Sequence, residues 1–230
     1  LRTLETRVIE SPQGEQIGMG FDEESLIEVS ISQFYGIEIN DFAVSVAKTA
    51  LWIAEEQMME ATQEILLQPF DFLPLKSNGN IHEGNALRMD WNDVLPAEEC
   101  CYIAGNPPFY GSSNCDSKQK KEITDLFGKV KRASSLDYVS GWYYKASEYM
   151  SRNDKVHTAF VSTNSITQGE QVFPIWDTLI GRFGISIDFA WRTFVWNSEA
   201  TDQAHVHCAI ISFSVGSHGG KRIFGSVGSA

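Results

Sequence analysis

Short apolar runs alternate with longer segments of helical periodicity along this chain, and this alternation is the feature that most limits its fold. The run FYGIEI at residues 34–39 has the period-two pattern of a strand. It leads directly into residues 41–66, with Asp41 as a candidate N-cap residue. Side chains recur at helical spacing in this segment, namely those of Phe42, Val46, Thr49, Leu51, Ile53 and Met58. The sequence therefore predicts a strand that is followed at once by a long helix.

The alternation continues along the rest of the chain. A brief strand and turn are expected in IHEGNALRMDW, and further strands in CYIAG, KVHTAFVST, ISIDFAWRTFVW and VHCAIISFSV. Helices are expected in LDYVSGWYYKASEYM and VFPIWDTLIGRF, and a loop with a helical piece in residues 112–135. This order predicts an α/β fold with an open, mostly parallel sheet and a terminal antiparallel strand pair. We expect one domain over residues 1–215 and a flexible, Gly/Ser-rich tail at residues 216–230.

Composition is typical of a folded, soluble protein. The 230 residues are 43% hydrophobic, which is enough to bury a core. There is no apolar run of about 18 residues, so we expect no membrane span. The cysteines lack the spacing of a zinc site or of a secreted disulfide framework, and they are Cys100, Cys101, Cys115 and Cys208. A reducing cytosol is therefore the simplest location.

The net charge of −12 argues against strong binding to nucleic acid by the chain as a whole, because neutralising phosphates supplies most of that affinity. Binding to DNA would need a basic partner domain or a local basic patch. One basic cluster is present, made of Lys118, Lys120, Lys121, Lys129, Lys131 and Arg132. This cluster is a candidate contact for the DNA backbone, and an ordinary solvated surface is the alternative.

Polar residues follow several of the expected strands. CYIAG is followed by Asn106, and the two prolines after it end the strand because proline cannot donate a ladder hydrogen bond. Glu38 and Asn85 come at the ends of two other expected strands. In open α/β sheets, ligands bind beyond the carboxyl ends of the strands. The sequence therefore predicts that these three residues line one edge of the sheet.

The tetrapeptide Asn106-Pro107-Pro108-Phe109 resembles the catalytic motif of amino-methyltransferases that use S-adenosylmethionine (AdoMet), above all those acting on adenine N6 in DNA. The resemblance implies a Rossmann-like methyltransferase sheet. It also implies that the amine donates hydrogen bonds to the Asn106 side-chain oxygen and the Pro107 carbonyl, which favours attack on the methyl group. Phe109, with Tyr110 beside it, would contact a base that has left the duplex. The alternative is a plain turn that ends a strand.

The same resemblance implies a cofactor site. Glu38, with Ile39 beside it, resembles the acidic residue that binds the ribose hydroxyls of AdoMet. EGNALRMDW resembles the next family segment, which would place Asn85 and Ala86 near the adenine ring or the target amine. The alternatives are an exposed acid at the end of a strand and an asparagine in a turn.

Two further segments, FVSTNSITQGEQV and FAWRTFVWNSEATDQAHVHCAIISF, are similar to one subgroup, the MmeI-like enzymes. These large bacterial polypeptides join an adenine methyltransferase to an endonuclease and a target-recognition domain. The resemblance covers most of residues 31–215. It implies that Phe194 and Trp196 lie beneath the flipped base, although ordinary core aromatics are the alternative. Arg192 and Asn197 are candidate contacts to phosphate or to the target base.

No metal site is expected. His205 and His207 share one face of an expected strand, but no cysteine or carboxylate has a suitable spacing from them. A structural role is the better interpretation of both histidines.

Parts of the family pattern are not found in this sequence. The opening LRTLETRVIE reads as the inside of a helix, and Gly14, Gly18 and Gly20 are poor substitutes for the family's glycine-rich turn. The first strand of the family's sheet, which lies between the strands that end at Glu38 and Asn106, is not found either. We therefore expect a partial domain that, in isolation, binds AdoMet weakly or not at all and is inactive.

The resemblance predicts a portion of a cytoplasmic, adenine-specific DNA methyltransferase from a bacterial restriction–modification system. Its cofactor would be AdoMet and its partner DNA, with a fused nuclease and a recognition domain outside these residues. The alternatives are an RNA-adenine or protein-glutamine methyltransferase and a non-catalytic scaffold.

Overall fold

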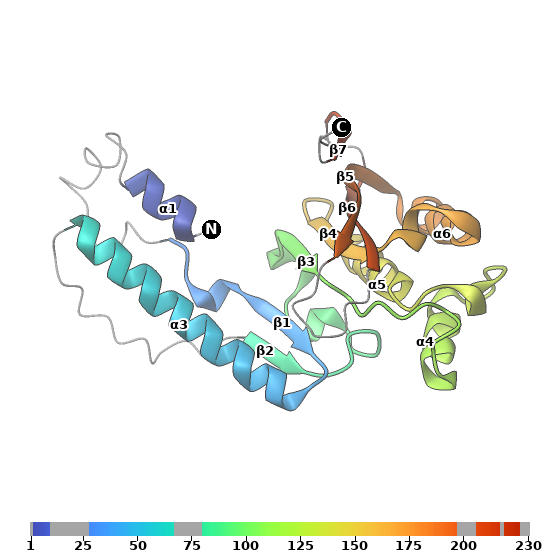
Figure 1. The fold of residues 1–230 in the computed structure, drawn as a ribbon, viewed down its shortest axis with the longest axis horizontal. Helices are drawn as coiled ribbons and strands as arrows, with labels where there is room; N and C mark the ends of the chain where they lie inside the picture. Colours follow the sequence, from blue (N-terminus) through green and yellow to red (C-terminus); the bar gives the residue numbers. More distant parts are fainter. Residues whose placement is uncertain (1, 10–27, 67–79, 197–205, 217–218, 226–230) are drawn as a thin grey trace. The chain divides into compact units, whose positions relative to one another are not determined.

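The strands that the structure describes form two sheets, one in each of two units of the chain. Unit 1 is Leu1–Met89 and unit 2 is Asp90–Ala230. The structure, a computed structural model, describes residues 2–9, 28–66, 80–196, 206–216 and 219–225 (Figure 1). Within these residues, no helix has both the length and the apolar character needed to cross a membrane.

Unit 1 pairs two short parallel strands beside a long helix. Residue Tyr35 lies opposite Asn80, and Glu38 lies opposite Glu83. The helix α3 contacts both strands, and α1 contacts α3 (Figure 1). The elements of this unit are α1 (Arg2–Ile9), η2 (Ile31–Gln33), β1 (Tyr35–Glu38), α3 (Asp41–Leu66) and β2 (Asn80–Glu83).

The helix predicted at residues 41–66 is α3, but Asn40 caps it rather than Asp41. The Asn40 Oδ1 atom accepts the backbone N–H of Ala43 at 3.0 Å, and the Asn40 carbonyl accepts that of Val44 at 2.9 Å. Asp41 is already the first helical residue. Because a capping side chain must reach the free N–H groups of the first turn from outside the helix, Asn40 is the residue in position to do so.

The buried face of α3 does not follow the apolar side chains that recur at helical spacing. Phe42 is 74% exposed, Val46 50% and Ile53 53%. The side chains that are buried in α3 are those of Val44, Glu55, Met59 and Thr62. The helical period was therefore predicted correctly, but the apolar positions do not mark the face that is buried within this chain.

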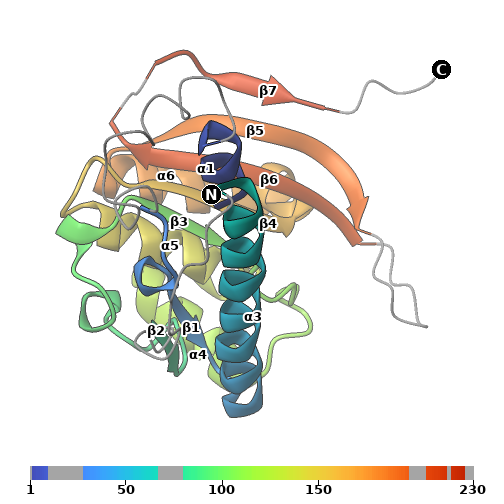
Figure 2. The ribbon, with the colours of Figure 1, turned by 90° about the vertical axis from the view of Figure 1, so that its left-hand side faces the viewer.

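Unit 2 contains a five-stranded sheet in the order β3-β4-β6-β5-β7. The pairs β3–β4 and β5–β7 are parallel, whereas β4–β6 and β6–β5 are antiparallel. Figure 2 shows β6, β5 and β7 in succession. The helices of this unit are η4 (Trp91–Asp93), η5 (Ala97–Glu99), α4 (Ser117–Phe127), η6 (Ala133–Ser135), α5 (Ser140–Met150), η7 (Asn164–Thr167), η8 (Gly169–Gln171) and α6 (Val172–Phe183). Its strands are β3 (Tyr102–Gly105), β4 (His157–Thr163), β5 (Ile185–Trp196), β6 (Val206–Val215) and β7 (Arg222–Phe224).

The predicted fold class is confirmed. Three of the five described strand pairings are parallel, and β5 with β6 forms the expected antiparallel pair. None of the described pairings joins β1 to β3, the two strands between which the family resemblance implies a further strand.

The core of unit 2 lies where α5 and α6 cover one face of the sheet. The Tyr143 ring of α5 lies 5.3 Å from the ring of Phe160, 5.1 Å from that of Phe213 and 5.7 Å from that of Trp176. The Tyr143 hydroxyl is hydrogen-bonded to the Ser162 hydroxyl, and burial raises the pKa of Tyr143. A buried hydroxyl needs such a partner, so this contact fixes α5 on β4.

The segment expected to be a frayed tail contains a strand. Residues 222–224 form β7, which pairs in parallel with β5, so the prediction of fraying is wrong for these residues. The ring of Phe224 stacks on that of Trp191 with centroids 5.8 Å apart. The local sequence is rich in glycine and does not by itself predict a strand. Residues 222–224 form a strand because they pair with the edge of β5. The domain boundary at residue 215 stays a prediction.

Candidate active site

The strand β3 ends at Gly105, and Asn106 follows at the carboxyl edge of the unit 2 sheet. Gly105 lies opposite Phe160 of β4. A Cβ atom at position 105 would lie 3.2 Å from the Phe160 ring, so glycine allows this close approach. Since β3 and β4 are parallel, the end of β4 at Thr163 lies at the same edge.

The residues of the Asn-Pro-Pro-Phe motif differ in exposure. Pro107 is buried and Phe109 is half-buried, whereas Asn106 and Pro108 are exposed. Among the residues that the structure describes, the Asn106 side chain has no hydrogen-bond partner. The buried proline therefore anchors the turn while the neighbouring amide stays accessible to a substrate.

Tyr110 follows the motif with a fixed backbone and an accessible ring. Its N–H donates to the Pro108 carbonyl at 3.1 Å, and its carbonyl accepts the Tyr138 N–H at 2.9 Å. The ring packs edge-on to the Tyr138 ring, with 6.5 Å between centroids, and Tyr110 is 48% exposed. The predicted substrate contact by Tyr110 is compatible with this exposure and remains a prediction.

Cys115 closes the loop that follows the motif. Its Sγ atom lies 3.5 Å from the Gly111 carbonyl oxygen and 3.8 Å from that of Tyr110. Burial raises the pKa of the Cys115 thiol, and the negative charge of Asp137 adds to this effect. A thiol that stays protonated is a structural hydrogen-bond donor here rather than a nucleophile.

Phe194 lies at the same edge of the sheet as the motif. The strand β5 runs in the direction of β3 and β4, because two antiparallel pairings separate it from β4. Thr163 and Phe194 both lie opposite Cys208, so they share one row across the sheet, about 10 Å apart. Phe194 is half-buried. This placement brings the predicted base-stacking residue to the edge that carries Asn106.

Other residues predicted near the target are only partly described. The Trp196 side chain, Asn197 and His205 lie outside the described residues, while Arg192 and His207 are exposed on β5 and β6. Within the described part of the chain, no three His, Cys, Asp or Glu side chains are grouped so as to hold a metal ion.

In unit 1, the ends of β1 and β2 place Glu38 beside the turn that contains Asn85. The Glu38 carbonyl accepts the Gly84 N–H at 2.8 Å, and its Oε1 atom accepts the Asn40 N–H at 3.0 Å. Glu38 is half-buried, and Ile39 is 68% exposed. A carboxylate next to an accessible apolar side chain is a suitable pair for a ribose and an attached flat ring.

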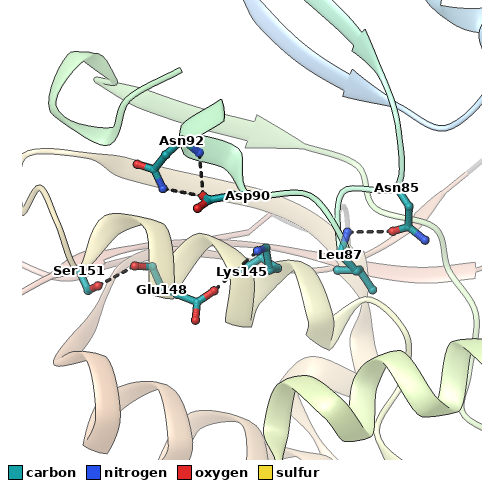
Figure 3. A network of polar contacts seen from close by, with 7 residues as sticks. All are labelled: Asn85, Leu87, Asp90, Asn92, Lys145, Glu148 and Ser151. Atoms are coloured by element: carbon teal, nitrogen blue, oxygen red, sulfur yellow. Dashed lines mark hydrogen bonds and ion pairs between the residues drawn. The ribbon is translucent and has the colours of Figure 1, made fainter. Parts of the chain in front are cut away.

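The side-chain oxygen of Asn85 is engaged in its own turn. It accepts the Leu87 N–H at 2.9 Å (Figure 3), and the Asn85 carbonyl accepts the N–H groups of Arg88 and Met89. This is the turn role that the sequence left as an alternative. Asn85 and Ala86 are both half-buried, and their predicted contacts to the cofactor stay predictions.

The prediction that Glu38, Asn85 and Asn106 line one edge is met within unit 1 for the first two residues. Asn106 follows a strand of unit 2, and its position relative to Glu38 and Asn85 stays a prediction.

The polar contacts of unit 2 that Figure 3 shows are local. The Asn92 side-chain and backbone N–H groups bond to Asp90 and lower its pKa, and Lys145 pairs with Glu148 at 3.6 Å.

All members of the basic cluster are exposed, and several of them lie on α4. A capping box of Asp116 and Gln119 begins this helix. Lys121 pairs with Asp125 at 2.6 Å, and Arg132 pairs with Glu170 at 2.5 Å.

Sequence reasoning missed one polar group of this site. Asp137 is buried and binds the loop that follows the motif. The available signal is an acidic residue next to the apolar run YVSGWYY, but the sequence pattern includes it in a predicted helix that begins only at Ser140.

Sequence comparisons relate this chain to known DNA methyltransferases. The family model described as "MmeI, DNA-methyltransferase domain" matches residues 1–225. DNA methyltransferase A of Bacillus subtilis (strain 168) is 47% identical over 189 residues, which are 80% of this chain and 21% of that protein.

Two solved structures of restriction-modification enzymes share the fold of this chain. The Type IIL restriction-modification enzyme MmeI in complex with DNA superposes with a TM-score of 0.89 at 44% identity, over 98% of this chain and 30% of that one. The DNA-bound Type ISP enzyme LlaBIII shares the fold alone, with a TM-score of 0.52 at 12% identity, over 96% of this chain and 17% of that one. This chain thus spans less than a third of each relative. It belongs to the family of the MmeI DNA-methyltransferase domain.

Proposed function

We propose that the protein containing this chain transfers a methyl group from AdoMet to the N6 amine of adenine in DNA, as part of a bacterial restriction–modification system. The observation that carries the proposal is the position of Asn106. Its amide is exposed at the carboxyl end of β3, has no partner among the described residues, and precedes two prolines.

The chemistry follows from hydrogen-bond geometry. An aromatic amine is a weak nucleophile because its lone pair is delocalised into the ring. One amine N–H would donate to the Asn106 Oδ1 atom and the other to the Pro107 carbonyl, which favours a tetrahedral nitrogen and stabilises the developing charge. Pro107 and Pro108 have no N–H, so no backbone donor competes with the amine. Phe109, Tyr110 and Phe194 would hold the flipped base by stacking.

The residues of unit 1 fit AdoMet, which supplies the methyl group when it is bound. The Glu38 carboxylate is half-buried at the end of β1, and a carboxylate can accept hydrogen bonds from both ribose hydroxyls. Ile39 offers an exposed apolar surface, and Asn85 and Ala86 follow the neighbouring strand.

DNA as partner is supported by the MmeI relative, which was solved in complex with DNA. We place the longer protein in the cytoplasm, with a nuclease and a recognition domain fused to this one. The nuclease would require magnesium, whereas the methyl transfer itself requires no metal.

The test uses the full-length protein, because residues 1–230 alone are expected to bind AdoMet weakly. Tritiated AdoMet and unmethylated genomic DNA are the substrates, and the methylated nucleoside is identified by mass spectrometry. Asn106→Ala should lower methyl transfer by at least about 100-fold and leave DNA binding unchanged, because it removes one acceptor of the reacting amine.

Asn114→Ala is the matched control, since Asn114 is an exposed asparagine of the same loop. It should retain wild-type activity. RNA and protein are offered in parallel reactions. Transfer of label to RNA adenine or to a glutamine side chain, and not to DNA, would overturn the proposal in favour of those enzymes. No transfer by the wild-type protein to any substrate would favour the non-catalytic scaffold.

A further inference from the structure

We propose that Asp137 is a positioning residue for methyl transfer, which holds the loop after the Asn106 motif against the loop after β4. This inference rests on the proposed function. Asp137 belongs neither to the motif nor to the predicted cofactor site, and it is a buried carboxylate, only 7% exposed.

Asp137 is itself held firmly in place. Its N–H donates to the Gln171 side chain at 2.7 Å, and its carbonyl accepts the Ser140 hydroxyl at 2.7 Å. Its two carboxylate oxygens accept from different loops: Oδ1 accepts the Ser112 N–H at 2.8 Å, and Oδ2 accepts the Ser165 hydroxyl at 2.5 Å. An ionised carboxylate is an acceptor-only group, so it suits two donors that approach from opposite loops.

The first link reaches the motif through a short segment. Ser112 follows Phe109 by three residues, and Tyr138, next to Asp137, binds the Tyr110 carbonyl with its N–H. Residues 110 and 112 are thus both bonded to the segment 137–138. Because the two prolines before them are rigid, fixing these residues limits how far Asn106 can move.

The second link reaches the strand that carries Phe194. The Ser165 hydroxyl also bonds to the Thr163 hydroxyl at 2.8 Å, at the end of β4. The adjacent Asn164 accepts the Thr193 hydroxyl at 2.9 Å, and Thr193 precedes Phe194 in β5. Asp137 therefore joins the loop predicted to bind the amine to the edge predicted to stack the base.

The expected effect of losing Asp137 follows from the geometry that methyl transfer requires. A displacement of about 1 Å at the reacting group lowers a rate by about 100-fold. Substrate affinity depends on many contacts and should change far less. A positioning role thus predicts a loss in kcat with little change in DNA affinity.

The experiment compares Asp137→Ala, Asp137→Asn and Ser165→Ala in the full-length protein, with unmethylated genomic DNA as the probe. Asp137→Ala should lower kcat by about 100-fold and leave the Kd for DNA within about threefold. Asp137→Asn should recover much of the loss, because its oxygen can accept the Ser112 N–H and its NH2 can donate to Ser165. Ser165→Ala should give an intermediate kcat. Asp154→Ala, an exposed aspartate of the same unit, is the control and should match the wild type.

A second measurement does not depend on activity. Hydrogen exchange of the backbone at residues 110–112 should be faster in Asp137→Ala and Asp137→Asn than in the wild type, with the larger change in Asp137→Ala, while α5 remains protected. If Asp137→Ala does not fold, kcat and hydrogen exchange at residues 110–112 in Asp137→Asn and Ser165→Ala test the inference instead.

Equal kcat values in all variants, or unchanged exchange at residues 110–112, would overturn the inference. A loss of kcat that merely follows a loss of folded protein would overturn it as well. If the wild-type protein transfers no methyl group, the proposed function fails, and the positioning role in methyl transfer fails with it. Exchange would then report only whether Asp137 anchors the loop.

Discussion

The exposure of Asn106 is produced by its neighbours. Gly105 lets β3 pair closely with Phe160, and the strand ends there, before buried Pro107, which has no N–H for a further ladder hydrogen bond. An asparagine between these two residues lies outside the core although the strand before it is part of the sheet. Neighbouring residues also differ in exposure at the first two cysteines, since Cys100 is buried and Cys101 is exposed.

We predict that Cys101 is the first of the four cysteines to be alkylated. Burial raises the pKa of Cys100, Cys115 and Cys208, so these thiols stay protonated near neutral pH and react faster only as pH rises. A short pulse of iodoacetamide at pH 7.5, followed by peptide mass spectrometry, should label Cys101 at least about tenfold faster than the others. Cys101→Ser should abolish this signal, whereas Cys115→Ser should not. Equal labelling of all four would contradict the burial pattern.

Strand direction organises the elements of unit 2. The strands β3, β4 and β5 end at one edge, so Asn106, Thr163 and Phe194 gather there although they are far apart in sequence. The helix α4 follows the motif and carries exposed lysines. A basic element that follows the Asn106 motif provides positive charge in a chain whose net charge is −12.

We predict that the lysines of the basic cluster contact DNA phosphates. Replacing Lys118 and Lys120 of α4, together with Lys129 just after the helix, by alanine should make the slope of log K against log salt less steep by up to about 3, because each lost phosphate contact removes about 0.9. The slope is measured by fluorescence anisotropy with a labelled duplex and the full-length protein. Lys155→Ala is the control, since Lys155 is exposed before the amino end of β4. A slope equal to the wild-type value would identify the cluster as ordinary solvated surface.

At the scale of the whole molecule, the stability of each unit depends on packing between segments that are distant in the sequence. In unit 2, Tyr143, Phe160, Trp176 and Phe213 come from two helices and two strands. In the part of unit 1 that the structure describes, α3 packs on a sheet of two short strands. The support of the candidate catalytic edge therefore lies in the aromatic core of unit 2.

We predict that Phe213→Ala destabilises unit 2 by about 3–5 kcal/mol, because it leaves a cavity among these rings. Hydrogen exchange in the α5 and α6 peptides should become faster, and it reports on this unit even in a longer protein. Ile223→Ala is the control, since Ile223 is 78% exposed. Unchanged exchange in α5 would show that this cluster does not hold the helix on the sheet.

Local sequence determined the elements and the motif. The bounds of α3, α6, β5 and β6 follow from periodicity and from breakers such as glycine. Asn106 is marked in the sequence by the two prolines after it, which must end a strand. Each of these signals lies within a few residues, where backbone geometry and hydrogen bonding are decided locally.

The tertiary structure decided what depends on distant partners. It selected the buried face of α3, where Glu55 and Thr62 are covered and Phe42 is not. It also recruited β7 from a glycine-rich segment and placed Asp137 between loops 25 and 28 residues away. Burial and long-range hydrogen bonds are properties of the assembled chain, so no local pattern specifies them.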